Sequence, residues 1–240
     1  MADKQVIPEQ NDSNEIVDRA RGFWAKYNKK IVIGGTVIIA LLAGFIGYKK
    51  LITEPNEAKA NDLIFPAEKL FGKMAGSSLY SKDTVNMVLN GDKEAGVTGL
   101  LKVASTYGGT KSGNRAKYII GACYLNLKQY DKAISFLKDF DANGATQIQS
   151  KAYLLLGSAY AEQKKTDDAL EYYKKAASIS NLDEAMASEA MFIAGAYAKE
   201  MNKTKEAIEI FQNLKDKYLA SQRVSSGEVD KYLGALGAAK

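Results

Sequence analysis

The feature that most constrains this chain is an unbroken apolar run at residues 31–48, IVIGGTVIIALLAGFIGY. As a helix, a run of this length would extend about 27 Å, close to the thickness of the hydrocarbon core of a bilayer. Lysines and an aromatic residue suited to a membrane interface mark its two ends: Lys29, Lys30 and Ile31 on one side, and Tyr48, Lys49 and Lys50 on the other. The run therefore predicts a transmembrane helix at 31–48.

Three other interpretations of the run fit less well. A helix buried in a soluble core is rarely apolar on all sides and closed by lysine pairs at both ends. A cleaved signal peptide needs a short basic start and a small-residue cleavage site, but residues 1–30 precede this run and Lys49 and Lys50 close it. No cysteine follows the run, which disfavours a lipoprotein anchor.

Basic residues flank the run unequally. Arg19, Arg21, Lys26, Lys29 and Lys30 precede it, whereas Lys49, Lys50 and Lys59 follow it. Because basic flanks tend to stay in the cytoplasm, this bias predicts a cytoplasmic N-terminus and a larger C-terminal part on the other side of the membrane. We expect a cytoplasmic tail over 1–30, disordered to about Asn14, and a charged linker over 49–58.

The composition of the remaining chain excludes several functions. The first 50 residues hold 8 of the 33 basic and 5 of the 28 acidic side chains, so residues 51–240 hold 25 and 23. Such a nearly neutral, mixed distribution argues against nucleic-acid binding. The chain has no histidine and one cysteine, Cys123, which removes the commonest general base and most transition-metal sites. We therefore predict a protein that is not an enzyme and has no cofactor, metal or small-molecule substrate.

Two segments imitate ligand-binding motifs. Residues 139–144 (DFDANG) copy the start of an EF-hand loop, but Ser150 stands where that loop needs a bidentate glutamate. Residues 108–113 (GGTKSG) lack the spacing of a phosphate-binding loop, and no strand is expected before them. Both segments are predicted to be turns between helices.

The second half of the chain repeats. The tetrapeptide GACY at 121–124 recurs as GSAY at 157–160 and as AGAY at 194–197. A small residue and then a large one follow each copy at similar spacing: Ala133 and Leu137, Ala169 and Tyr173, Ala207 and Phe211. A period of about 36 residues made of two helices is typical of a solenoid of helical hairpins. In this alignment the third repeat carries one extra residue.

These positions resemble the tetratricopeptide repeat (TPR) over about 115–219, although the family's tryptophan and closing proline are absent. The resemblance implies an all-α fold: one N-terminal transmembrane helix and a right-handed α-solenoid of TPR hairpins with a C-terminal capping helix. The TPR-like domain would cover 59–240, with a degenerate first unit at 59–113, repeats at about 114–148, 150–181 and 187–219, and a capping helix at 226–238. Within the first unit we expect a helix interrupted or started late at Pro66, and further helices near 84–89 and 94–107.

In this repeat family the first helix of each hairpin lines a concave groove that holds a peptide or a partner helix. Carried over to this chain, the groove would consist of Arg115, Tyr118, Leu125, Asn126, Lys151, Leu154, Ser158, Glu162, Ser188, Met191 and Lys199. Tyr118 and Ala122 occupy two positions at which some members grip a terminal carboxylate, which disfavours a receptor of that type.

The layout of tail, anchor, charged linker and hairpins is similar to the bacterial single-pass inner-membrane proteins typified by the ancillary subunit of the SecYEG translocon. It implies a periplasmic, membrane-tethered scaffold or chaperone-like protein that binds proteins or peptides at the Sec translocon during export. Its partners would be the translocon, exported polypeptides and, through one helix, membrane lipid. Two alternatives stay open: a TPR adaptor of another envelope machine, for outer-membrane assembly, secretion or division, and a cytoplasmic adaptor of reversed orientation.

Overall fold

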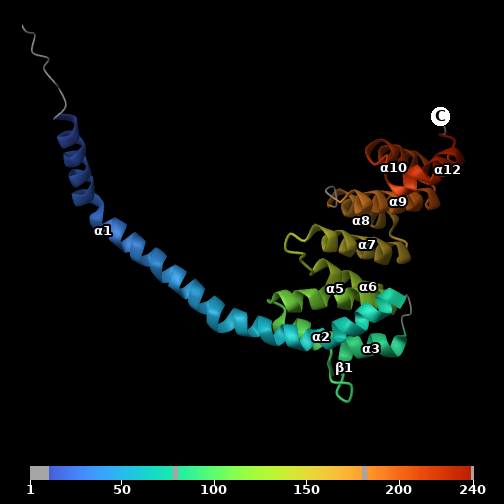
Figure 1. The fold of residues 1–240 in the computed structure, drawn as a ribbon, viewed down its shortest axis with the longest axis horizontal. Coiled ribbons are helices and arrows are strands. Elements are labelled where there is room, and N and C mark those ends of the chain that lie inside the picture. The colour runs from blue at the N-terminus through green and yellow to red at the C-terminus, as the bar shows by residue number, and fades with distance from the viewer. Residues whose placement is uncertain (1–10, 78–80, 180–182, 239–240) are drawn as a thin grey trace, which may run out of the picture. The chain divides into compact units, whose positions relative to one another are not determined.

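A computed structural model describes residues 11–77, 81–179 and 183–238 of the chain. The chain divides into two compact units, Met1–Pro55 and Asn56–Lys240. The described residues are almost entirely helical, with one pair of very short strands in the second unit (Figure 1). This agrees with the all-α class that the sequence predicts.

The first unit contains α1, Asn11–Tyr48, followed by a π-helical turn, Lys49–Thr53. The apolar segment of α1 is not buried by any part of the protein, and the side chains of Ile38 and Leu42 are 59% and 55% exposed. Within the described residues, one N-terminal helix is thus long and apolar enough to span a membrane. The expected disorder up to Asn14 is wrong for residues 11–14, which are helical, and residues 1–10 lie outside the described part of the chain.

The stretch 49–58, expected to be a linker, is also helical. The π-helical turn is followed at once by α2, Glu54–Ser77. Pro55 does not prevent this: it is the second residue of α2, directly after the π-helical turn, and the helical run continues through it. Pro66 lies inside α2, and the helix runs through it, so the predicted late start is wrong.

A β-hairpin interrupts the region where a helix over 94–107 is expected. After α3, Lys82–Asn90, strands β1, Gly91–Asp92, and β2, Val97–Thr98, pair antiparallel, and α4 spans only Leu100–Tyr107. Gly91 has a φ of +87°, which an L side chain rarely adopts. A Cβ at Gly99 would lie 2.3 Å from the carbonyl carbon of Asn90. Close backbone approach at two glycines therefore permits the hairpin that shortens α4.

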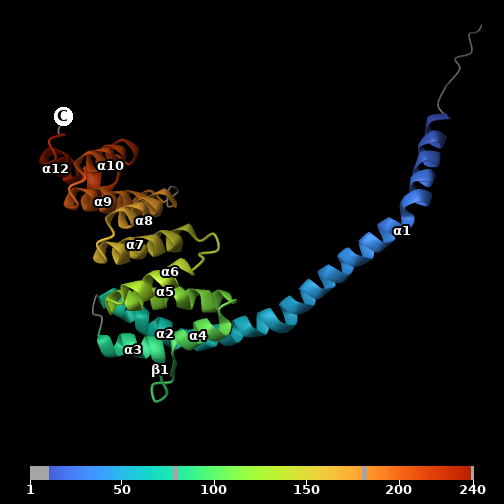
Figure 2. The ribbon, with the colours of Figure 1, turned by 180° about the vertical axis from the view of Figure 1, so that it is seen from behind.

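Six helices then form three antiparallel hairpins: α5, Lys111–Asn126, with α6, Tyr130–Lys138; α7, Thr146–Glu162, with α8, Thr166–Ile179; and α9, Glu184–Glu200, with α10, Thr204–Lys217. Both views show these helices stacked in chain order (Figures 1 and 2). A short α11, Gln222–Ser225, leads to α12, Glu228–Ala235, which packs on α10 at the end of the stack. The expected capping helix thus covers 228–235 rather than 226–238.

Two clusters of buried side chains hold the stack together. One joins α2 to α5 and includes the fully buried Ile64 and Ile120. The other runs from α6 to α12 and includes the fully buried Phe211 and Leu214. Since each hairpin contributes to its neighbours' core, no single hairpin buries its apolar face alone.

A glycine at the crossing of each hairpin fixes the structural register of the repeats. A Cβ added to Gly121 would lie 2.5 Å from the side chain of Leu137, and one added to Gly157 would lie 2.5 Å from the ring of Tyr173. In the third hairpin the same contact is made by Gly195, where a Cβ would lie 2.9 Å from the ring of Phe211. The equivalent of Gly157 is therefore Gly195 and not Ala194, as the sequence alignment assumed.

This register removes the extra residue predicted in the third repeat. The glycine and the large residue that it contacts are 16 positions apart in all three hairpins. The crossing glycines are 36 residues apart from the first hairpin to the second and 38 from the second to the third, so the extra length lies between the second and third hairpins. The turns obey the same register, because Lys128, Lys164 and Asn202 each lie seven residues after the glycine and have φ values of 59°, 59° and 58°. A left-handed residue at this place ends the first helix of each hairpin in the same way.

The crossing glycines lead to a prediction about stability. In Gly157→Ala, the added methyl group would collide with the buried Tyr173 ring, and we expect a loss of about 1–3 kcal/mol in the free energy of unfolding. Gly72→Ala is the matched control, since nothing lies within 4 Å of its Cβ position and helix propensity favours alanine by about 0.5–1 kcal/mol. Urea unfolding followed by circular dichroism would measure both; equal effects of the same sign would contradict the crossing contact.

Candidate protein-binding groove

A depression of about 690 Å³ lies between α2, α5, α7 and the connection from α6 to α7. Three of the predicted groove residues, Arg115, Tyr118 and Lys151, line it. Its surface is mostly apolar, and the rings of Tyr118 and Phe140 pack with their centroids 5.5 Å apart in its floor. The structure therefore brings together groove residues from the first two hairpins, but it adds a wall from α2 that no repeat supplies.

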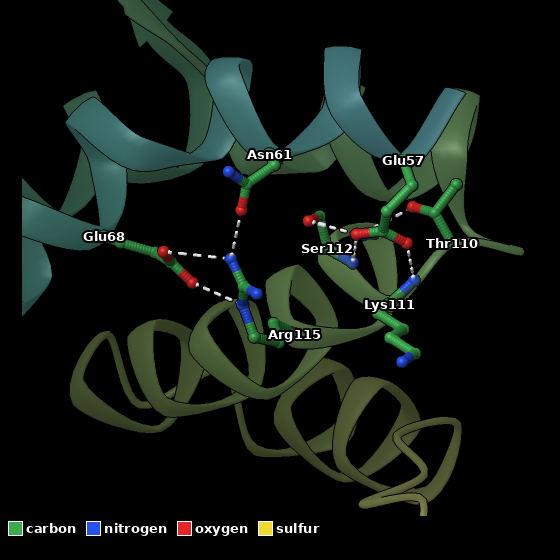
Figure 3. A network of polar contacts seen from close by, with 8 residues as sticks. Glu57, Asn61, Glu68, Thr110, Lys111, Ser112 and Arg115 are labelled. Atoms are coloured by element: carbon green, nitrogen blue, oxygen red, sulfur yellow. Dashed lines mark hydrogen bonds and ion pairs between the residues drawn. The ribbon is translucent and has the colours of Figure 1, made fainter. Parts of the chain in front are cut away.

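Polar contacts attach this α2 wall to α5 (Figure 3). The Arg115 guanidinium donates to both carboxylate oxygens of Glu68, at 2.9 and 3.3 Å, and to the side-chain oxygen of Asn61 at 3.1 Å. Arg115, a predicted groove residue, thus lines the depression and also binds α2. Paired guanidinium and carboxylate groups fix geometry well because both are planar.

A second contact from α2 caps the N-terminus of α5. The carboxylate of Glu57 accepts hydrogen bonds from the backbone N–H groups of Lys111 and Ser112, at 2.6 and 2.9 Å, and from the Ser112 hydroxyl at 2.6 Å. These are N–H groups that a helix cannot satisfy internally, and a negative charge there is also favoured by the helix dipole. Glu57 is thus an N-terminal cap supplied from a distant part of the sequence (Figure 3).

The hydrogen bonds of this cap change the pKa of the Glu57 carboxyl. Burial raises the pKa of its carboxyl, but the hydrogen bonds from Ser112 and Lys111 and the charge of Arg115 outweigh burial and lower the pKa below its ordinary 4.5. A lowered folded-state pKa contributes stability that is present above the ordinary value and is lost as the pH falls through the folded-state value.

We accordingly expect Glu57→Gln to lower the free energy of unfolding by about 1 kcal/mol at neutral pH, because charge-assisted hydrogen bonds are replaced by weaker ones at a half-buried site. The difference between wild type and variant should shrink below pH 4.5, as the wild-type carboxyl takes up a proton. Thermal melts over a pH series would measure it. A difference that stays constant across this range would contradict the role of the charge.

Other predicted groove residues of the first two hairpins lie outside the depression. Leu125 is half-buried against the first core cluster, and Asn126 donates to the Ala122 carbonyl at 2.9 Å. Leu154 packs against Ala176 and Ala177 of α8, the Ser158 hydroxyl donates to the Leu154 carbonyl at 3.0 Å, and Glu162 accepts from the Tyr130 hydroxyl at 2.9 Å. The structure thus gives these side chains partners within the repeat array.

The third-hairpin predictions were displaced by the register error. Ser188 is buried and bonded to the Ala185 carbonyl, and Met191 packs near Ala190 in the α8–α9 contact. The residues one step further on, Glu189 and Phe192, occupy the positions that correspond to Lys151 and Leu154. By the same shift Glu200, and not Lys199, corresponds to Glu162, and the Lys199 ammonium lies 5.2 Å from the centre of the Tyr232 ring of α12.

Arg223 of α11 covers these corrected positions. Its guanidinium lies 4.2 Å from the centre of the Phe192 ring and donates to Glu189 at 2.7 and 2.8 Å and to Glu228 at 2.8 Å. The hydrogen bonds from Arg223 hold the pKa of Glu189 below its ordinary value. The end of the chain thus reshapes the surface at α9, where Ser188, Glu189 and Arg223 line a separate depression of about 720 Å³, and the depression over α5 and α7 is left free of it.

Residues that the sequence singles out for possible chemistry lie as follows. Cys123 is fully buried, as expected for a packed thiol, and burial raises its pKa to about 12, so it is unreactive at neutral pH. The described ranges contain no group of three histidine, cysteine, aspartate or glutamate residues placed to hold a metal ion. Residues 139–144 lie in a connection between helices, where Asp141 accepts from the Asn143 backbone at 2.8 Å. Of residues 108–113 only 108–110 form the predicted turn, since Lys111 begins α5, which Thr110 caps by accepting from Gly113 at 3.0 Å.

The hairpins match a known repeat family. Residues 115–140, 150–183 and 189–218 each match the tetratricopeptide repeat. No curated protein matches the chain. Repeats of this family are generally non-enzymatic scaffolds for protein–protein interaction, and a mostly apolar groove suits such a role. The chain therefore carries an array of tetratricopeptide repeats after one N-terminal helix long and apolar enough to span a membrane.

Proposed function

We propose that this protein is a membrane-tethered scaffold that binds polypeptides at the Sec translocon during export, with its repeats in the bacterial periplasm. The observation that carries the tether is the apolar segment of α1, which no part of the protein buries. An unburied apolar helix of this length is stable in lipid and unstable in water. Tethering confines the groove to the membrane surface, which raises its effective concentration near a membrane partner.

The repeat array supports the choice of partner class. Its depression over α5 and α7 is apolar and open, has the volume of a typical ligand site, and is framed by side chains that hydrogen-bond to one another. Such a surface suits segments of polypeptide rather than nucleic acid, since the charged side chains that line it are of both signs and sum to only +1. The excess of lysine and arginine before the apolar run supports the periplasmic side for the repeats.

Site-specific photo-crosslinking in living cells tests this proposal. A photoreactive residue at Ile148, which is 41% exposed in the depression, should capture translocon subunits or exported chains. The same residue at Leu219, which is 68% exposed and does not line the depression, is the matched control. Capture of components of a different envelope machine from position 148 alone would favour the alternative adaptor role.

The side of the membrane needs a separate test. When only the outer membrane is permeabilised, added protease should digest the repeats, and an antibody to the C-terminal part should lose its band. Complete protection of the repeats under these conditions, with digestion after lysis, would place them in the cytoplasm and contradict the export role. A sample digested after denaturation is the control: it shows that the protease can cut the repeats, so that a band surviving in the other samples reflects protection by the membrane.

A further inference from the structure

We propose, building on the protein-binding role above, that the depression between α2, α5 and α7 selects extended peptide segments in which a large apolar side chain is flanked by acidic residues. Site and ligand class follow from two properties of the lining: an apolar floor, and lysines on two walls that make no ion pair with any of the residues that the structure describes. The α2 wall distinguishes this site from the surface that repeats alone would make.

The floor accounts for the apolar part of the ligand. Phe71 of α2, Tyr118 and Ile119 of α5 and Phe140 after α6 meet there, and Ile148 of α7 is exposed at the edge. Ile119 and Phe140 are almost fully buried, so their packing gives the floor a fixed shape. A volume of about 690 Å³ admits one large side chain with the adjoining backbone.

The charges around the floor account for the acidic part. Five charged side chains line the depression, and they sum to +1: Glu68, Asp141, Lys111, Arg115 and Lys151. Arg115 and Glu68 neutralise each other at 2.9 Å. Lys111 and Lys151 stand on the α5 and α7 walls, and among the described residues neither ammonium makes an ion pair. Two lysines on different helices of the lining favour a ligand that carries carboxylates beside its apolar anchor.

Several backbone and side-chain amide groups at the rim of the depression already make hydrogen bonds within the protein. The Asn114 side chain bonds both the carbonyl and the N–H of Asp141, and Glu57 fills the N-terminus of α5. The Asp141 carboxylate accepts from the backbone N–H of Asn143 and is an acidic group of the rim. Asp141 is therefore the one lining residue that should oppose an acidic ligand.

Fluorescence anisotropy on the full-length protein in nanodiscs of neutral lipid tests this selection. The probes are two labelled ten-residue peptides that share one central phenylalanine in a Gly-Ser frame, one with glutamates and the other with lysines on both sides of it. The glutamate peptide should bind at least about tenfold more tightly, and the preference should fall when salt is raised from about 0.05 to about 0.5 M. Equal binding of both peptides, or a preference for lysine, would overturn the proposal.

Variants assign the preference to the site. In Lys111→Glu with Lys151→Glu the preference should reverse in favour of the lysine peptide, whereas Lys231→Glu, an exposed charge on α12 outside the depression, should leave it unchanged. If the double variant binds the lysine peptide more tightly than the wild type does, the double variant is folded. Asp141→Asn, which keeps its shape, should tighten binding of the glutamate peptide roughly threefold. Unchanged affinities in both variants would overturn the site.

The experiments distinguish a failure of this ligand class from a failure of the proposed function. If crosslinks to the translocon form at position 148 but peptide charge makes no difference, only the ligand class fails. If purified protein selects acidic peptides but no envelope component is captured in cells, the selection stands and the export role fails.

Discussion

Two arginines in the apolar segment, Ile38→Arg with Leu42→Arg, should release the protein from the membrane. Both positions lie in the middle part of the run, and both side chains are exposed, so neither arginine would disturb packing within the protein. Near the centre of a bilayer each arginine costs about 2.5–3.5 kcal/mol on insertion scales, so the pair removes about 5–7 kcal/mol from insertion. This cost is comparable to the whole favourable free energy of inserting a short apolar helix into a bilayer.

Carbonate extraction followed by ultracentrifugation measures the effect. Wild type should stay in the pellet at an intact mass of 26.1 kDa, and the double variant should appear in the supernatant or be degraded. Leu219→Arg is the control, because this residue is 68% exposed in the second unit and should not affect the pellet. A wild-type protein that is soluble or shortened by the length of its N-terminal segment would contradict the anchor.

The elements that sequence predicts best are those with a physical period. The apolar run is visible because nearly every residue of 31–48 is apolar, and the hairpins are visible because small and large residues recur at the helix crossings. Both signals are local. They suffice for the all-α class, for the apolar helix and for three repeats, and the matches to the tetratricopeptide repeat bear out the last of these.

The register error has a specific cause. Aligning the tyrosines Tyr160 and Tyr197 places Ala194 opposite Gly157, but packing decides which small residue meets the large one, and this is Gly195. The constant spacing of 16 residues from Gly157 to Tyr173 and from Gly195 to Phe211 was present in the sequence and would have given the right answer. Crossing contacts are therefore a better guide to register than a shared tyrosine.

Other features had weak local signals or none. Gly91, Gly96 and Gly99 cluster where the β-hairpin forms, and this cluster argued against a helix from residue 94. The cap of α5 by Glu57 could not be foreseen, because it joins residues 54 and 55 positions apart through contacts that no sequence period encodes. The same holds for Arg223 over Phe192, so the extent of the open groove depended on tertiary packing.

Phe211→Ala should destabilise the end of the array more than any other substitution discussed. The side chain is fully buried, fills the space left by Gly195, and packs its ring 5.0 Å from Tyr232 of α12 and 5.8 Å from Phe192 of α9. Truncation of a buried phenylalanine costs about 3–5 kcal/mol, since apolar contacts are lost and a cavity remains. Phe65→Ala is the matched control, because this phenylalanine is 63% exposed, and its change should stay within about 0.5 kcal/mol.

The location of the loss distinguishes this contact from a general weakening. In a repeat array each unit is stabilised mainly by its neighbours, so amide hydrogen exchange in Phe211→Ala should accelerate most in α9, α10 and α12 and least in α5. Urea unfolding by circular dichroism gives the total, and exchange measured by mass spectrometry gives the distribution. Because Arg223 and Tyr232 both rest on the ring of Phe192, loss of Phe211 should also loosen α11 and expose the Glu189 position of the groove. Faster exchange confined to α5, or a loss no larger than that of Phe65→Ala, would show that Phe211 does not hold the cap in place.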